Sequence, residues 1–226
     1  MNAVTARTSL TRDVQVSLLA AFAGARRERS PFPHWELSGV LPVGFSETLR
    51  GLPFPAPDLG GVSGKRELHN DQRHYFDAAN RARFPICTAV AEAFQSREVV
   101  EAIEAQTGAR LEGTYVRLEY AQDIDGFWLE PHTDLGVKRF TMLLYLTPDP
   151  GQADLGTDLY ERPGVWARRS RFVDNCAVVF VPGDNTWHGL ERRAISGVRR
   201  SLIMNYVTED WRAREQLAYP ENPIGA

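Results

Sequence analysis

The stretch Glu130-Pro131-His132-Thr133-Asp134 decides how the rest of this chain is interpreted. In an extended backbone, residues two apart point to the same face, so His132 and Asp134 can reach one ion together. A third ligand must come from elsewhere, and His188 follows a later strand-like run. Two imidazoles and one carboxylate on one face of an octahedron leave three adjacent positions open, which is typical of non-haem iron(II) sites.

A His-x-Asp pattern alone occurs often by chance, so a second feature is needed. Downstream of His188 lies the strand-like run Gly197-Val198-Arg199-Arg200-Ser201-Leu202. A guanidinium at Arg199 can form a bidentate pair with a dicarboxylate whose other end binds the metal. Ser201, two residues along, faces the same way. The three ligands followed by Arg-x-Ser form a specific combination.

The two halves of the chain carry different hydrophobic patterns. The first half predicts helices that begin at Thr11 and at Pro42 and that cover 84–94 and 96–107, with a short strand over 34–37. The second half predicts short strands over 111–120, 140–146, 176–181 and 199–207. Strands that follow a helical block indicate a β-sandwich or barrel with helices outside it. We expect one domain over residues 1–226, with a helix-rich support over about 1–108 and the β core over about 109–210.

The composition is that of an ordinary globular protein. With 226 residues and a formal net charge of -3, the chain can bury a sizeable core and has no charge excess that indicates a nucleic acid or acidic membrane. Cys87 and Cys176 lie apart without metal-site spacing, which favours free thiols in a reducing compartment. No signal peptide and no apolar run of ~20 residues is evident. We therefore expect a cytoplasmic protein without nucleic acid or membrane partners.

Beyond these residues, the sequence resembles the iron(II)/2-oxoglutarate-dependent dioxygenase superfamily, in particular its prolyl 4-hydroxylase-like branch. The resemblance extends from Pro33 to about Val207, and its specific part lies between Tyr120 and Ser201. The segments that carry it are Val116-Arg117-Leu118-Glu119-Tyr120, 127–134, 140–146, 156–160 and Val178-Val179-Phe180-Val181-Pro182. It implies a mainly β fold with flanking α-helices, a double-stranded β-helix or distorted jelly roll with the helical N-terminal half packed on the β core.

The resemblance also implies roles for single residues. The iron ligands fall on His132, Asp134 and His188, and the cosubstrate contacts fall on Arg199, Ser201 and Tyr120. A tyrosine packed in the core would explain Tyr120 equally well. The implied cofactors are Fe(II), 2-oxoglutarate as cosubstrate and O₂, with ascorbate as an in vitro reductant. The implied reaction is an oxidation, most simply a hydroxylation, that releases succinate and CO₂.

The substrate is harder to predict than the reaction. Four residues close to the proposed ligands are candidates for the substrate pocket, namely Arg117, Trp128, Glu130 and Trp187. Their mixed polarity favours a small polar molecule, such as an amino-acid or sugar derivative. Residues 60–80, which include His69 and His74, and the arginine-rich segment 160–171 are candidates for a lid.

Three alternatives remain open from the sequence. The first is a hydroxylase of protein side chains, which an extended groove that leads to the metal would favour. The second is a jelly-roll module that binds a metal or a ligand without turnover. The third is a zinc hydrolase, which is disfavoured because it would lack an evident general base and would leave Arg199 without a role.

Overall fold

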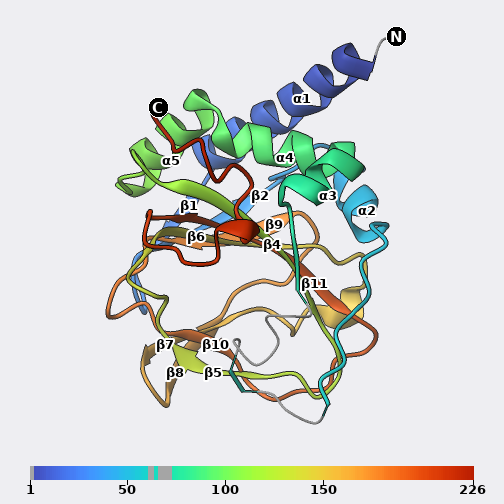
Figure 1. The fold of residues 1–226 in the computed structure, drawn as a ribbon. Helices are drawn as coiled ribbons and strands as arrows, with labels where there is room; N and C mark the ends of the chain where they lie inside the picture. Colours follow the sequence, from blue (N-terminus) through green and yellow to red (C-terminus); the bar gives the residue numbers. More distant parts are fainter. Residues whose placement is uncertain (1–2, 61–63, 66–72) are drawn as a thin grey trace.

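Two facing β-sheets and a helical layer make up the part of the chain that the computed structural model describes, residues 3–60, 64–65 and 73–226. The larger sheet has seven strands in the order β1-β2-β9-β6-β11-β4-β3, and the smaller has four in the order β5-β10-β7-β8. The strands of the larger sheet are β1 (Arg26–Glu28), β2 (His34–Ser38), β3 (His74–Tyr75), β4 (Tyr115–Asp123), β6 (Lys138–Tyr145), β9 (Cys176–Phe180) and β11 (Arg199–Val207). Those of the smaller sheet are β5 (Leu129–His132), β7 (Asp158–Arg162), β8 (Val165–Arg169) and β10 (His188–Leu190). The predicted double-stranded β-helix with flanking helices is confirmed (Figure 1).

The helices cover the outer face of the larger sheet (Figure 1). They are α1 (Ala3–Ala23), α2 (Phe45–Arg50), α3 (Ala78–Arg83), α4 (Pro85–Gln95) and α5 (Arg97–Thr107), with short 3-10 turns at η2 (Pro150–Gln152) and η3 (Arg214–Gln216). The helices predicted over 84–94 and 96–107 correspond to α4 and α5. No helix in the described ranges is long and apolar enough to cross a membrane.

The helix predicted to begin at Pro42 begins at Phe45. Two further boundaries differ from the sequence prediction, and the structure shows a contact at each. Thr11 does not cap a helix, because α1 begins well before it, and its hydroxyl instead donates to Glu92 of α4 at 2.6 Å. The strand predicted from residue 111 begins at Tyr115, because Gly113 has a φ of 72° and Thr114 N–H closes a turn onto Leu111 O at 3.0 Å. In the first case a tertiary contact uses the hydroxyl that was expected to cap the helix, and in the second case a turn sets the start of the strand.

Alternation along the central strands divides the core into two parts. On β4, β6 and β11 one set of side chains packs against the helices, including Leu118, Met142 and Met204. The opposite set faces the space between the sheets, where Leu143 and Ile203 belong to a second apolar cluster. The polar residues that alternate with the first set therefore also point between the sheets.

The arginine-rich segment 160–171 is part of a hairpin and does not form a lid. Strands β7 and β8 pair antiparallel with a turn at Gly164, whose φ is 76°. The buried carboxylate of Asp158 anchors this hairpin by accepting from Trp166 Nε1 at 2.9 Å and from Arg169 Nε at 2.8 Å. The ion pair with Asp158 holds Arg169 on β8, and Arg168 of the same strand pairs with Glu36 of β2.

Candidate metal and cosubstrate site

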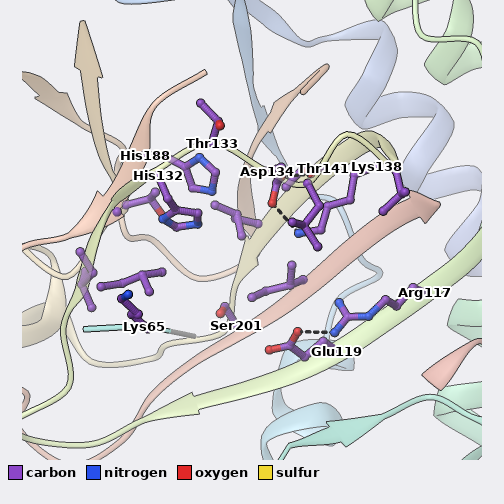
Figure 2. Close-up of a pocket in the computed structure, with 18 of the residues that line it drawn as sticks. Lys65, Arg117, Glu119, His132, Thr133, Asp134, Lys138, Thr141, His188 and Ser201 are labelled. Carbon is purple, nitrogen blue, oxygen red and sulfur yellow. Dashed lines mark hydrogen bonds and ion pairs between the residues drawn. The ribbon is translucent and has the colours of Figure 1, made fainter. Parts of the chain in front are cut away.

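The three proposed ligands meet at the smaller sheet. His132 ends β5 and His188 begins β10, and the two residues are direct partners in the antiparallel pairing of these strands. Their ring centroids lie 4.4 Å apart. One ligand atom from each of His132, Asp134 and His188 lies within 4.8 Å of the other two. Figure 2 shows the two imidazoles side by side, with Asp134 across from them.

Backbone hydrogen bonds set the tautomer of both imidazoles. His132 Nδ1 lies 2.9 Å from Glu130 O, and His188 Nδ1 lies 3.0 Å from Thr186 O. A carbonyl oxygen only accepts, so each Nδ1 carries the proton and each Nε2 keeps its lone pair. Both rings are thus prepared to bind a metal through Nε2.

Asp134 is held as a buried carboxylate. Its side chain is 4% exposed, Lys138 forms an ion pair with Oδ1, and Thr141 Oγ1 donates to Oδ2 at 2.6 Å. Burial alone would raise its pKa, but the charge of Lys138, the electrostatic effect of the nearby His188 ring and the hydrogen bonds of Lys138 and Thr141 together lower the pKa well below the ordinary value. Asp134 is therefore ionised at neutral pH, as a metal ligand must be.

These ligands open into a cavity of about 790 Å³ between the two sheets. Arg199 and Ser201 of β11 line the same cavity. Its rim comes from three separate parts of the chain, namely 64–65, 133–137 and 210–213. The wall beyond the ligands carries charges of both signs, from Lys65, Arg117, Glu119, Glu130, Asp210 and Arg212.

Arg199 is buried and rigidly held. Its Nε donates to Leu155 O at 2.7 Å, and its Nη1 donates to Asp123 at 2.5 Å. Its guanidinium lies 5.1 Å from the ring centre of Phe172. Within the described part of the chain, Nη2 has no hydrogen-bond partner. Arg199 can thus offer a cavity-facing donor to a carboxylate while it keeps its internal partners, and Ser201, 2% exposed, adds a hydroxyl beside it.

Tyr120 was predicted to contact the cosubstrate, but its side chain does not line the cavity. Tyr120 points to the helical side of β4, where it packs in the same cluster as Leu118 and lies 5.5 Å from Phe54 between ring centres. Burial raises its pKa to about 12, so it remains a neutral phenol. The reason is alternation, because Glu119 and Ala121 of β4 face the space between the sheets and Tyr120 cannot do so.

Two of the four residues predicted for the substrate pocket line the cavity, and two do not. Arg117 and Glu130 line the cavity, whereas Trp128 and Trp187 lie outside its lining. Trp128 packs on Gly64, where an added Cβ would lie 2.6 Å from the indole, and Arg192 stacks on its ring at 4.9 Å.

Two histidines belong to the segment 60–80, which the sequence predicts as a candidate lid. His74 stacks on Phe54 with ring centres 4.5 Å apart, away from the cavity, and His69 lies outside the described residues.

Several cavity residues were not predicted from the sequence. They are Glu119, Lys138, Thr141 and Thr157. A signal for Glu119 was available, because it alternates with Arg117 on β4 and so shares its face. Thr141 carried the same signal once β6 was placed, since it alternates with Leu143. Thr157 lies directly before β7, and its hydroxyl accepts from Tyr145 at 2.9 Å.

Comparison with known proteins adds evidence on the fold. No family model matches the chain, and no curated protein matches it. Among solved structures, it is similar to a prolyl-4-hydroxylase from Pseudomonas putida, with a TM-score of 0.55 and 16% identity over 86% of this chain and 98% of that one. A prolyl 4-hydroxylase from Phytophthora capsici gives a TM-score of 0.55 and 16% identity over 90% of this chain and 67% of that one.

A third similar structure contains a ligand. It is a prolyl hydroxylase from Trichoplax adhaerens in complex with a peptide fragment of the hypoxia inducible factor oxygen degradation domain, with a TM-score of 0.57 and 12% identity over 93% of this chain and 94% of that one. At these identities the three likenesses show the fold. The chain has the fold of prolyl 4-hydroxylases.

Proposed function

We propose that this chain, folded as prolyl 4-hydroxylases are, is an iron(II)- and 2-oxoglutarate-dependent oxygenase that hydroxylates a small polar molecule and releases succinate and CO₂. One observation carries the proposal: His132, Asp134 and His188 converge in a cavity that also contains the buried cation Arg199. A metal site needs only the first three residues. A dicarboxylate cosubstrate bound to the metal also needs the fourth.

The residues fit iron(II) and the cosubstrate. The two Nε2 atoms and one carboxylate oxygen supply borderline nitrogen and hard oxygen donors, and three donors leave adjacent positions open. Arg199 and Ser201 would hold the far carboxylate of 2-oxoglutarate. The iron, with 2-oxoglutarate and O₂, supplies the oxidising chemistry, and the protein orients the reactants and excludes water.

The proposed substrate class rests on the size and polarity of the cavity. A volume of about 790 Å³ lies within the range of about 300–1,000 Å³ that is usual for small-molecule sites. Part of this volume would hold 2-oxoglutarate. The remaining wall presents Lys65, Arg117, Glu119 and Glu130, so it suits a compact molecule with several polar groups.

A peptide substrate is the alternative with a specific observation behind it. The Trichoplax adhaerens enzyme, which shares this fold, is seen with a peptide fragment. In this chain the segments 64–65, 133–137 and 210–213 line the cavity, and each contains at least one exposed residue. Residues on several sides of the cavity favour a small molecule that fits inside it entirely over an extended peptide that would cross it.

The test is succinate release by the purified protein. With Fe(II), ascorbate and 2-oxoglutarate, the native protein should form succinate slowly without substrate, and His132→Ala should abolish this activity. His74→Phe is the matched control, because His74 stacks on Phe54 outside the cavity, and this variant should retain the activity. Absence of succinate from the native protein with every substrate tried would contradict the oxygenase proposal.

A second step tests the substrate class. Free amino acids, sugar derivatives and proline-containing peptides are compared for their ability to increase succinate formation above the basal rate. We expect stimulation by a small polar compound. Stimulation by peptides alone would overturn the small-molecule part of the proposal and leave the oxygenase part intact.

A further inference from the structure

We infer that Arg117, Asn205 and Thr141 form a positioning relay that fixes the orientation of Asp134 in the metal site. The three residues come from the neighbouring strands β4, β11 and β6, and the relay runs from the cavity wall to the proposed ligand. This inference rests on the proposed function, because it assigns a role to residues behind a proposed iron ligand. Two of its residues, Asn205 and Thr141, are not singled out by the sequence, and the third, Arg117, is predicted from the sequence only as a substrate contact.

The direction of each hydrogen bond in the relay is determined. Thr141 Oγ1 accepts from Asn205 Nδ2 at 2.9 Å, so its single proton is donated to Asp134 Oδ2 at 2.6 Å. The Asn205 amide is oriented by its other end, where Oδ1 accepts from Arg117 Nη1 at 3.2 Å. Every donor therefore points toward Asp134, and a permanent cation begins the series.

The start of the relay is immobilised from several sides. Arg117 Nη2 donates to Glu119 at 2.9 Å, and its Nε donates to Gln216 at 3.0 Å. Its guanidinium lies between the rings of Tyr75 and Trp211, at 4.9 and 4.8 Å from their centres. Figure 2 shows Arg117 and Glu119 on the wall below Asp134 and Thr141.

Burial prevents water from replacing these contacts. Arg117 is 5% exposed, Thr141 is 1% exposed and Asn205 is 0% exposed. A buried donor or acceptor that loses its partner costs about 1–3 kcal/mol, so other orientations of the amide and hydroxyl are disfavoured. The three side chains therefore keep a single pattern of hydrogen bonds.

The consequence for the metal site concerns the two oxygens of Asp134. Oδ2 is bonded to a hydroxyl that is itself held from behind, whereas Oδ1 faces the flexible side chain of Lys138. A lysine can turn away when a metal ion arrives, but Thr141 cannot. The relay therefore leaves Oδ1 as the metal-binding atom and keeps the carboxylate monodentate, which preserves open positions for the cosubstrate and O₂.

The test measures Mn(II) affinity by electron paramagnetic resonance, which does not require turnover. Thr141→Val removes the hydroxyl at nearly constant volume and should weaken Mn(II) binding by about 10- to 100-fold, the usual effect of losing a contact to a metal ligand. Thr141→Ser restores a hydroxyl and should bind Mn(II) nearly as the native protein does. The control is Thr88→Val, whose lost hydrogen bond to Arg81 O at 2.6 Å lies in the helical layer. It should leave Mn(II) affinity unchanged.

Asn205→Ala tests the middle of the relay and gives a second variant if Thr141→Val folds poorly. It frees the Thr141 hydroxyl and should weaken Mn(II) binding in the same direction but by less. Native affinity in folded Thr141→Val, or in folded Asn205→Ala, would overturn the relay. If the native protein bound no Mn(II), or bound it equally after His132→Ala, the proposed function itself would fail, so the two failures are distinguishable.

Discussion

Arg199 illustrates how a single side chain is prepared for its proposed ligand. It already satisfies Asp123 and Leu155 O with two of its nitrogens, and only a forked guanidinium can do this and still face the cavity. Arg199→Lys keeps the positive charge but loses the planar guanidinium group and its several N–H donors. We expect the apparent KM for 2-oxoglutarate to rise about tenfold or more, because one charge-assisted hydrogen bond is worth about 1.5–3 kcal/mol. The requirement for iron should not change.

The neighbouring Arg200 provides the control for this experiment. It is half-buried, points to the other face of β11 and donates to Gln122 at 3.3 Å. Arg200→Lys should leave the KM for 2-oxoglutarate at the native value. If Arg199→Lys raised the requirements for iron and for 2-oxoglutarate equally, Arg199 would have a structural role instead.

The metal-site residues could be predicted because histidine and aspartate are uncommon in strand-like runs and because their positions follow a recognisable pattern. His132 and Asp134 are two apart, and His188 is followed by Arg199. Asn205 could not be found in this way, since an asparagine in an apolar strand has many explanations. Its partner Thr141 is adjacent only because β6 and β11 pair.

At the scale of elements, the close approach of β10 to β5 brings the two histidines together. Gly189 follows His188, and a Cβ added there would lie 2.7 Å from Leu129 O and 3.1 Å from Glu130 O. Gly189→Ala must separate the two strands. We expect a stability loss of about 1–3 kcal/mol, typical of overpacking, together with weaker Mn(II) binding. Urea denaturation and a Mn(II) titration measure the two effects.

Gly51→Ala is the matched control for this variant. The nearest atoms to a Cβ added at Gly51 lie 3.5 Å away or further, at the end of α2, so ordinary contact results. It should change neither the Mn(II) affinity nor the stability by a comparable amount. Native Mn(II) binding by a folded Gly189→Ala protein would show that the spacing of β5 and β10 does not set the ligand geometry.

The elements of the larger sheet were more predictable than those of the smaller one. The strands β6, β9 and β11 are rich in apolar residues and mostly buried on both faces, since helices cover one side and the second sheet covers the other. The strands β5 and β10 are short and carry the polar ligands, and β8 is partly exposed. Their composition resembles that of loops, so only the positions of His132 and His188 indicated them.

Tyr120 was misassigned for a related reason. Its role was carried over by resemblance, and a one-residue difference in strand register moves a side chain to the opposite face. The register of β4 is fixed by its nine-residue pairing with β11, in which Tyr120 lies opposite Leu202. Both side chains belong to the cluster under the helices.

For the whole molecule, the buried His34 predicts how stability depends on pH. His34 is 0% exposed, its Nδ1 bonds to Phe32 O at 2.8 Å, and burial lowers its pKa below 6.5. Above pH 6.5 the folded and unfolded chains both hold it neutral. As the pH falls below 6.5, the unfolded chain takes up a proton first, so folding stability decreases, by at most about 1.4 kcal/mol per pH unit for one group.

Urea denaturation at pH 7, 6 and 5 checks this expectation. His34→Phe should be less stable than the native protein at pH 7, because its hydrogen bond is lost, but should lose less stability between pH 7 and pH 5. Val40→Ala is the control, since it removes buried apolar atoms without a titrating group and should keep the native pH dependence. Equal pH dependence in His34→Phe and native protein would refute the role of His34.

The rim of the cavity has a consequence for how such proteins diversify. His132 and His188 lie in paired strands, whereas 135–137 and 210–213 line the cavity from connections outside the strand pairing. Insertions and exchanges in these connections can accumulate without moving an imidazole. Proteins that share this fold can therefore differ at the mouth of the cavity while the paired strands stay in place. Exchanging 135–137 and 210–213 would therefore change the mouth of the cavity while His132, Asp134 and His188 keep their places.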